Sequence, residues 1–227
     1  VSALMLGPGT TVTHAAIKAC AESNTPVCWV GESGMRFYAI GVTPTHDNAR
    51  ARHQARVHAS KKRRETVAQR MFEKRFGDPA VVQGQTVKAL MGMEGKRVKA
   101  MYEEMGSRYG VTWKGRNYNP ANWALADGIN RAISAANACL YALTTAIVCA
   151  MGYVPHLGFI HSAGTLPFVF DVADIYKPET TLVAAFQTLG ANPAADEKSV
   201  LTSLKFIIEE RRLTSRIPKD VEWLLDV

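Results

Sequence analysis

Residues 127–151, DGINRAISAANACLYALTTAIVCAM, carry the clearest helical pattern of this chain. Their apolar side chains recur at alternating steps of four and three residues, which predicts a long amphipathic helix. Asp127 is well placed to cap the amino end of this helix, and Gly152 to end it. The apolar positions are Ile129, Ile133, Ala136, Leu140, Leu143 and Ile147.

Polar side chains repeat at the same steps on an adjacent face of this helix. They are Asn130, Ser134, Asn137 and Tyr141. A buried polar stripe needs hydrogen-bond partners, which a functional cleft would supply. Simple exposure to solvent explains the pattern equally well.

The fold class we predict is mainly α with a small β part. Residues 26–30 and 35–40 are predicted strands joined by a turn, and residues 3–6 are a further short apolar run. Helices are predicted at 48–76, as one long basic helix, at 86–109, near 180–190, and around the apolar positions of 200–208. We therefore expect residues 1–45 to be the remainder of a truncated N-terminal β domain, and residues 46–227 to be all-helical.

The composition is that of an ordinary globular protein. The chain has 227 residues, of which 47% are hydrophobic, enough for one sizeable core or two small domains. We expect no signal peptide, no membrane-spanning segment and a cytoplasmic location. The four cysteines show no paired spacing and are predicted to be buried thiols: Cys20, Cys28, Cys139 and Cys149.

Positive charge is concentrated in one segment. Residues 50–75 carry ten Lys and Arg against two Glu, whereas the chain as a whole has a net charge of +7. Such a band predicts a polyanionic partner, most plausibly nucleic acid, although a solvated helix face is the alternative. The main predicted DNA-binding residues are Lys61, Lys62, Arg63 and Arg64, and weaker candidates are Arg36, Arg97, Lys99 and Arg108.

The segment HSAGTLPFVFDVADIYK (161–177) combines one imidazole and two carboxylates with mostly apolar neighbours. In a helix, Asp171 and Asp174 share one face, and His161 precedes them in a glycine-containing loop. Imidazole and carboxylate together are ligands of divalent metals. The alternative is structural: Asp171 as a helix cap, Asp174 paired with Lys177, and His161 as a hydrogen-bonded core histidine.

Glu94 is a further carboxylate that needs a cation. It lies on the same predicted helix face as Leu90, Val98, Met101 and Met105, which makes it buried or cleft-facing. Arg97, three residues later, is one possible partner. A metal ion shared with the His161 segment is the other.

Four segments resemble the CRISPR-associated integrase family, the larger catalytic subunit of the spacer-acquisition complex, and most closely its type I-E branch. They are GMEGKR (92–97), INRAISAANACLY (129–141), GFIH (158–161) and FVFDVADIYK (168–177). The resemblance implies an N-terminal β domain, whose opening strands are missing here, and a helical catalytic domain. It further implies a divalent metal held by Glu94, His161 and Asp174, with Asp171 and Tyr141 as further catalytic residues.

The same resemblance implies a homodimer that works with a small ferredoxin-like partner, the CRISPR-associated protein two, on double-stranded or branched DNA in a prokaryote. The predicted function is a metal-dependent DNA integrase and endonuclease, which joins 3′-hydroxyl ends of prespacer DNA into a CRISPR repeat by transesterification. Mg²⁺ or Mn²⁺ would serve as the ion. A non-catalytic DNA-binding scaffold, and a general nuclease or metallohydrolase acting on a small substrate, are the alternatives.

Overall fold

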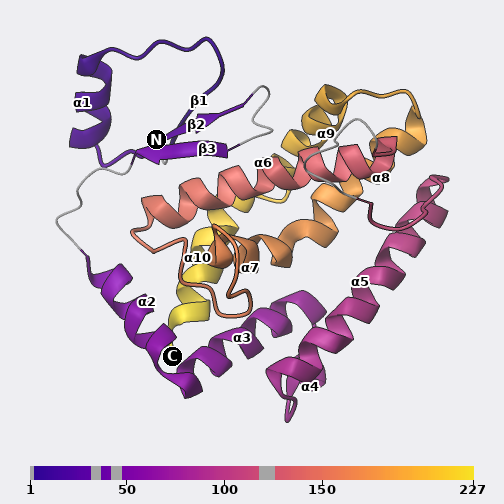
Figure 1. Cartoon of the computed structure of the whole chain (residues 1–227), viewed down its shortest axis with the longest axis horizontal. Coiled ribbons are helices and arrows are strands. Elements are labelled where there is room, and N and C mark those ends of the chain that lie inside the picture. Colours follow the sequence, from indigo (N-terminus) through magenta and orange to yellow (C-terminus); the bar gives the residue numbers. More distant parts are fainter. Residues whose placement is uncertain (1–2, 32–36, 42–47, 118–125) are drawn as a thin grey trace.

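The computed structural model describes residues 3–31, 37–41, 48–117 and 126–227. Helix α6 (Gly128–Ala150) crosses the middle of the molecule, with the small sheet on one side and most other helices on the other (Figure 1). The described chain is mainly helical with a small β part, so the predicted fold class is confirmed.

Helix α6 forms where its caps and periodicity predict. The Asp127 carboxylate accepts a hydrogen bond from the Asn130 amide at 2.9 Å, which satisfies one of the free amides of the first turn. Five of the six predicted apolar positions are buried, and only Leu143 is half-buried. One part of the helix packs with α8 and α9, and another part with α7 and α10.

The other helices include those predicted, together with α4 and α10, which were not predicted. Their bounds are α2 Ala49–Ala59, α3 Lys61–Phe76, α4 Pro79–Val82, α5 Val87–Tyr109, α7 Pro167–Tyr176, a 3-10 turn η3 Lys177–Glu179, α8 Thr181–Ala191, α9 Glu197–Glu210 and α10 Leu213–Leu225. Helix α5 begins after the Thr86 cap and ends at Gly110, which has a positive φ of 67°. This conformation suits glycine, which has no side chain to clash.

The prediction of one long helix over 48–76 is wrong. Ser60 has extended backbone angles and separates α2 from α3, and its hydroxyl accepts a bond from the Arg63 amide. Serine competes for backbone hydrogen bonds and therefore favours the start of a helix over its interior. The two helices meet at an angle that carries the basic band around one edge of the molecule (Figure 1).

The β part packs directly on α6. Strand β1 (Leu4–Leu6) pairs in parallel with β2 (Val27–Val30) after helix α1 (His14–Glu22), and β2 pairs antiparallel with β3 (Phe37–Gly41). Cys28 and Val30 contact Ala142 and Ala146 of α6, and these small side chains allow a close approach. The predicted domain boundary at residue 45 falls among residues 42–47, outside those described.

The polar stripe of α6 is satisfied within the fold. Arg116 donates to Asn130 Oδ1 at 2.8 Å and to Ser134 Oγ at 2.7 Å. Asn137 Oδ1 accepts from the Thr181 hydroxyl at 2.7 Å. The stripe therefore ties α6 to its neighbours, and its solvent-exposed alternative is wrong because these three side chains are buried.

Among the described residues, helix α6 is long and apolar enough to cross a membrane, although no such segment was expected from the sequence. Of its most apolar 18-residue stretch, 72% is buried inside the protein, as in the core helix of a globular fold.

The cysteine prediction is confirmed in part. All four are free thiols, but only Cys28 and Cys149 are buried, while Cys20 and Cys139 are half-buried.

Candidate active site

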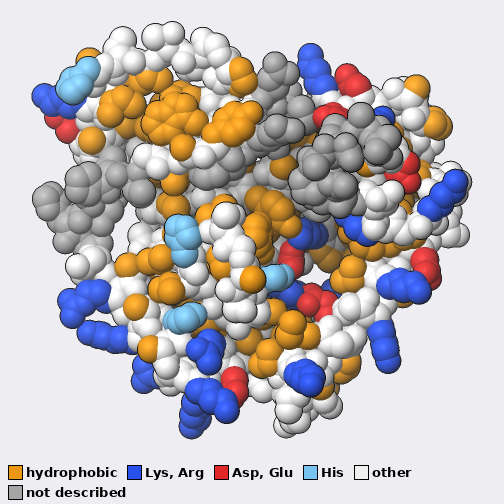
Figure 2. All heavy atoms as spheres, in the orientation of Figure 1, with side chains coloured by type: hydrophobic (Ala, Val, Ile, Leu, Met, Phe, Trp, Pro, Cys, Tyr) orange, Lys and Arg blue, Asp and Glu red, His pale blue; other side chains and the backbone are white. Residues whose placement is uncertain are grey.

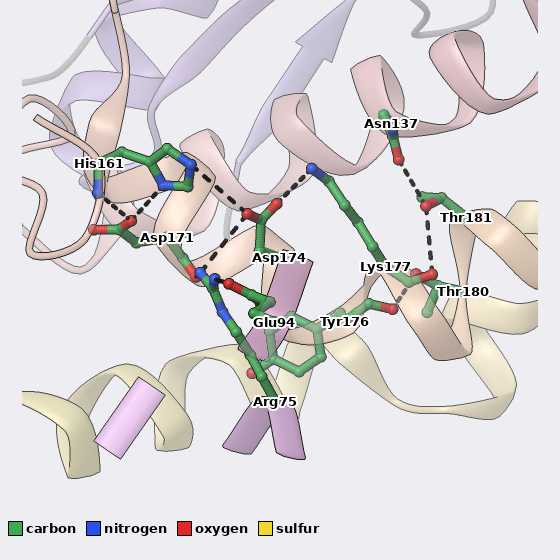
Figure 3. Close-up of polar contacts among 10 residues, drawn as sticks. All are labelled: Arg75, Glu94, Asn137, His161, Asp171, Asp174, Tyr176, Lys177, Thr180 and Thr181. Atoms are coloured by element: carbon green, nitrogen blue, oxygen red, sulfur yellow. Dashed lines mark hydrogen bonds and ion pairs between the residues drawn. The ribbon is translucent and has the colours of Figure 1, made fainter. Parts of the chain in front are cut away.

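Asp171 is the buried anchor of the site. Its side chain projects from α7 and is fully buried. Its carboxylate accepts hydrogen bonds from the backbone amides of Phe159 (2.6 Å), Ile160 (3.0 Å) and His161 (2.9 Å). Three amides on one carboxylate hold the loop before α7 against that helix, and Figure 3 shows the contacts from His161. The structural alternative proposed Asp171 as a helix cap, and this is wrong, because Asp171 lies inside α7 and binds the preceding loop.

His161 is oriented by the same carboxylate. Its Nδ1 lies 2.6 Å from Asp171 Oδ1, and in the neutral ring an Nδ1–H that donates to this carboxylate leaves Nε2 with its lone pair. Nε2 faces Asp174 Oδ2 at 3.9 Å. The hydrogen bond to Asp171 raises the pKa of His161, although burial works in the opposite direction. An imidazole whose second nitrogen is held by a carboxylate has the arrangement of a metal-ligating histidine.

Glu94 has a partner that the sequence reasoning missed. Arg75 of α3 donates from Nη1 to both carboxylate oxygens of Glu94, at 2.8 and 2.9 Å. Its Nη2 donates to the Asp171 carbonyl at 2.9 Å and lies 3.7 Å from Asp174 Oδ2. Arg75 follows Met71 and Phe72 at helical spacing, so a basic residue in phase with a buried face was the available signal.

Arg97, the predicted alternative partner of Glu94, bonds elsewhere. Its Nη2 donates to the backbone carbonyl of Arg75, and its guanidinium lies 5.4 Å from the centre of the Phe76 ring. Burial lowers the pKa of Arg97, with Glu94 acting against that shift. Arg97 therefore supports the segment that carries Arg75.

Asp174 also has an internal cation. Its Oδ1 forms an ion pair with Lys177 one turn later, as the structural alternative expected. The Lys177 ammonium lies 4.8 Å from the centre of the Tyr141 ring, which packs edge-on against Phe170. Burial, the largest single influence, lowers the pKa of Lys177, but the attraction of Asp174 and Tyr141 together outweighs it, so the net effect raises this pKa. Tyr141 is thus brought to the edge of the site by α6.

The donor set suits a divalent ion, whereas its present arrangement serves Arg75. Glu94 and Asp174 offer two carboxylates and His161 offers an imidazole nitrogen, a set typical of Mg²⁺ and Mn²⁺ sites. Among the residues that the structure describes, no three such side chains are gathered closely enough to hold an ion as they stand. The Arg75 guanidinium lies among these side chains and contacts both Glu94 and Asp174 (Figure 3).

The predicted DNA-binding residues lie in different surroundings. Lys61, Lys62 and Arg63 are exposed at the start of α3, and basic side chains gather along this edge (Figure 2). Arg64 is half-buried and donates to the His58 carbonyl at 3.3 Å. Lys99 is exposed and Arg108 pairs with Glu104 at 3.8 Å, both on α5, while Arg36 lies outside the described residues.

Three further residues of the basic band hold the C-terminal helix. Arg50 pairs with Glu222 at 2.6 Å, and Lys74 pairs with Asp220 at 2.7 Å. Arg70 donates to the last turn of α10, at the carbonyl of Trp223. Part of the charge concentration is therefore structural, and the C-terminal segment docks on its own chain.

Comparison with known proteins gives consistent matches. A family model described as CRISPR associated protein Cas1 matches residues 78–196. The CRISPR-associated endonuclease Cas1 2 of Chlorobaculum tepidum is 40% identical over 227 residues, which cover 99% of this chain and 76% of that protein. The CRISPR-associated endonuclease Cas1 of Escherichia coli is 39% identical over 225 residues, covering 99% and 73%. The crystal structure of a TtCas1–DNA complex matches with a TM-score of 0.86 at 40% identity, covering 99% of this chain and 84% of that one.

Proposed function

The chain belongs to the family of CRISPR-associated Cas1 proteins, and from this premise we propose that it is a metal-dependent DNA integrase and endonuclease. The 3′-hydroxyl of a prespacer DNA end would attack a phosphodiester of the CRISPR repeat. The observation that carries the proposal is convergence: α5 and α7 bring Glu94 and Asp174 to one guanidinium, and the loop before α7 places His161 Nε2 3.9 Å from Asp174.

In this proposal Glu94, His161 and Asp174 hold the divalent ion. Carboxylate oxygens suit Mg²⁺ and Mn²⁺ alike, and the imidazole makes Mn²⁺ at least as acceptable. When bound, the ion would polarise the scissile phosphate and stabilise the charge that develops on it. Asp171 acts through His161: it keeps the proton on Nδ1 and leaves Nε2 facing Asp174.

The reaction balances without any further cofactor. The attacking 3′ oxygen forms a bond to phosphorus, the bond from phosphorus to the repeat strand's 3′ oxygen breaks, and the proton of the attacking hydroxyl passes to the leaving oxygen through solvent. With water as the nucleophile, the same exchange would be cleavage of branched DNA. Tyr141, at the edge of the site, is the proposed hydrogen-bond donor to the phosphate or the leaving oxygen.

DNA would be held mainly by the exposed residues at the start of α3, because backbone phosphates are bound by charge without sequence reading. The proposed set keeps Lys61, Lys62, Arg63, Arg64, Lys99, Arg108, Arg97 and Arg36, with Arg64 and Arg97 also engaged in the fold. The TtCas1 relative, solved as a DNA complex, supports DNA as the partner.

The assembly is proposed from the family resemblance. It comprises a homodimer formed through the β part, a small ferredoxin-like CRISPR-associated protein two, and a location in the cytoplasm of a prokaryote. The type I-E assignment and the division into a β domain and a catalytic domain belong to the same proposal.

The test is a joining assay with the small partner protein present. A short duplex with 3′-hydroxyl ends is incubated with a supercoiled repeat-bearing plasmid, in Mn²⁺, in Mg²⁺ and in chelator. We expect joining that requires the ion and is lost in His161→Ala. The matched control is His156→Ala, an exposed histidine of the same loop, which should join normally. Joining that survives His161→Ala would refute the assigned site.

A scaffold function is the second candidate, and one observation favours it. Arg75 and Lys177 already neutralise Glu94 and Asp174, so the acidic cluster is stable as a purely structural ion network. This candidate predicts DNA binding that is indifferent to metal and to Asp174→Asn, with no joining under any condition. The two candidates therefore give opposite results in the same assay.

A further inference from the structure

Arg75 lies at the centre of the acidic site, although it belongs to the basic segment of residues 50–75. Its side chain is only 1% exposed. One guanidinium contacts three acidic residues: both oxygens of Glu94, the backbone carbonyl of Asp171 and, at 3.7 Å, a carboxylate oxygen of Asp174 (Figure 3). These contacts come from α5 and α7, whereas Arg75 belongs to α3.

The surrounding fold keeps Arg75 in this position. Its guanidinium lies 5.5 Å from the centre of the Phe72 ring, and Phe72 is fully buried in α3. Its backbone carbonyl accepts a bond from Arg97 of α5. The side chain is therefore held by its own helix on one side and by α5 on the other, and it is not a mobile surface residue.

The electrostatics place Arg75 in competition with a metal ion. A buried arginine is stabilised only if acidic partners compensate its charge, and here Glu94 gives both of its oxygens to that task. The Glu94 and Asp174 side chains are 19% and 21% exposed, so water screens their charges weakly. An ion that takes the same oxygens must displace the guanidinium or share them with it.

We propose that Arg75 is a positioning residue that replaces the metal ion in the ion-free protein and weakens ion binding. It keeps Glu94 and Asp174 close together despite their like charges, and it gives up Glu94 when an ion enters. This inference rests on the proposed metal site. Arg75 then competes with the ion for the carboxylates of Glu94 and Asp174. Filling the metal site would therefore require a higher ion concentration than it would without Arg75.

The experiment is a Mn²⁺ titration followed by electron paramagnetic resonance, at one pH and without DNA. Wild type is compared with Arg75→Gln, which removes the charge, and with Arg75→Lys. The lysine keeps the charge but cannot contact Glu94 and the Asp171 carbonyl through two separate nitrogens. Removal of a unit positive charge that contacts Glu94 and Asp174 should tighten Mn²⁺ binding by about tenfold or more. Arg75→Lys should lie between wild type and Arg75→Gln. The matched control is Lys74→Gln, which removes the neighbouring charge paired with Asp220 and should leave Mn²⁺ affinity unchanged.

A thermal measurement gives an independent readout. Arg75→Gln should melt at a lower temperature than wild type in chelator and recover more on Mn²⁺ addition, since tenfold tighter binding adds about 1.4 kcal/mol of stabilisation. Adding Glu94→Gln to Arg75→Gln should abolish the recovery. Where Arg75→Gln does not fold, the Arg75→Lys titration decides alone.

The outcomes separate this inference from the proposed function. Equal or weaker Mn²⁺ binding in Arg75→Gln and Arg75→Lys overturns the inference, while the metal site stands if wild-type binding is lost in Asp174→Asn. Absence of Mn²⁺ binding in wild type and every variant overturns both, and leaves Arg75 as a structural ion-pair partner.

Discussion

Replacement of Asp171 by alanine is expected to destabilise the protein far more than loss of the histidine that Asp171 orients. The fully buried carboxylate accepts three backbone amides, of Phe159, Ile160 and His161, together with the His161 ring. A hydrogen bond to a charged group contributes about 1.5–3 kcal/mol, and an amide left buried without a partner costs about 1–3 kcal/mol. The loop can relax toward water, so we expect a net loss of about 3–5 kcal/mol for Asp171→Ala.

His161→Ala removes only the ring contact, because the three backbone bonds do not need the imidazole. It should cost about 1 kcal/mol. The side chain of His161 is 40% exposed, which limits the packing that is lost with it. The pair of variants therefore separates the anchoring function of Asp171 from the chemical function proposed for His161.

Urea unfolding followed by far-ultraviolet circular dichroism at neutral pH measures both variants. For a chain of 227 residues, a loss of 3–5 kcal/mol corresponds to a fall of roughly 6–20 °C in Tm. A loss below about 1 kcal/mol for Asp171→Ala would refute the reasoning. Equal losses for Asp171→Ala and His161→Ala would refute it as well, because the ring would then be the main contact.

Three further outcomes are expected. The triple variant Lys61→Gln, Lys62→Gln, Arg63→Gln should bind DNA more weakly and reduce the slope of log affinity against log salt by roughly 2 to 3, measured by fluorescence anisotropy, because each lost phosphate contact removes about 0.9. An unchanged slope would place the DNA elsewhere. Gly158→Ala should destabilise the fold by at least about 2 kcal/mol in urea, since a Cβ there collides with the His161 carbonyl and with Pro167; wild-type stability would contradict this close packing. Burial raises the pKa of Cys149 to about 11, so at pH 8 its thiol should react with Ellman's reagent roughly 100-fold more slowly than in urea, and faster as pH rises toward that pKa; equal rates would show the thiol to be accessible.

Much of the helical architecture was predictable because its signals are local. Caps, glycine stops and apolar periodicity located α5 and α6 within a residue or two, since each depends on neighbours no more than four residues away. The error at Ser60 has the same origin, because a serine inside a helical pattern is tolerated or begins a new helix according to the packing around it.

The candidate site was predictable in composition but not in pairing. The sequence indicated Glu94, His161, Asp171 and Asp174, and the structure brings all four together. Their metal-binding assignment remains a proposal. The ion pair of Asp174 with Lys177 was visible as an i, i+3 spacing. The ion-pair partner of Glu94 was not visible in this way, because that partner, Arg75, lies 19 residues away on another helix.

The helical class, the positions of the central helices and the family could be inferred from the sequence alone, because periodicity, caps and motifs are properties of short segments. Which basic residues have contacts within the fold became visible only from the packing of the helices. Arg50, Arg70 and Lys74 hold α10, and Arg75 is buried among the acidic residues. A charge counted along the chain has no partner until helices distant in sequence pack together, and its desolvation and pairing are then set by that packing.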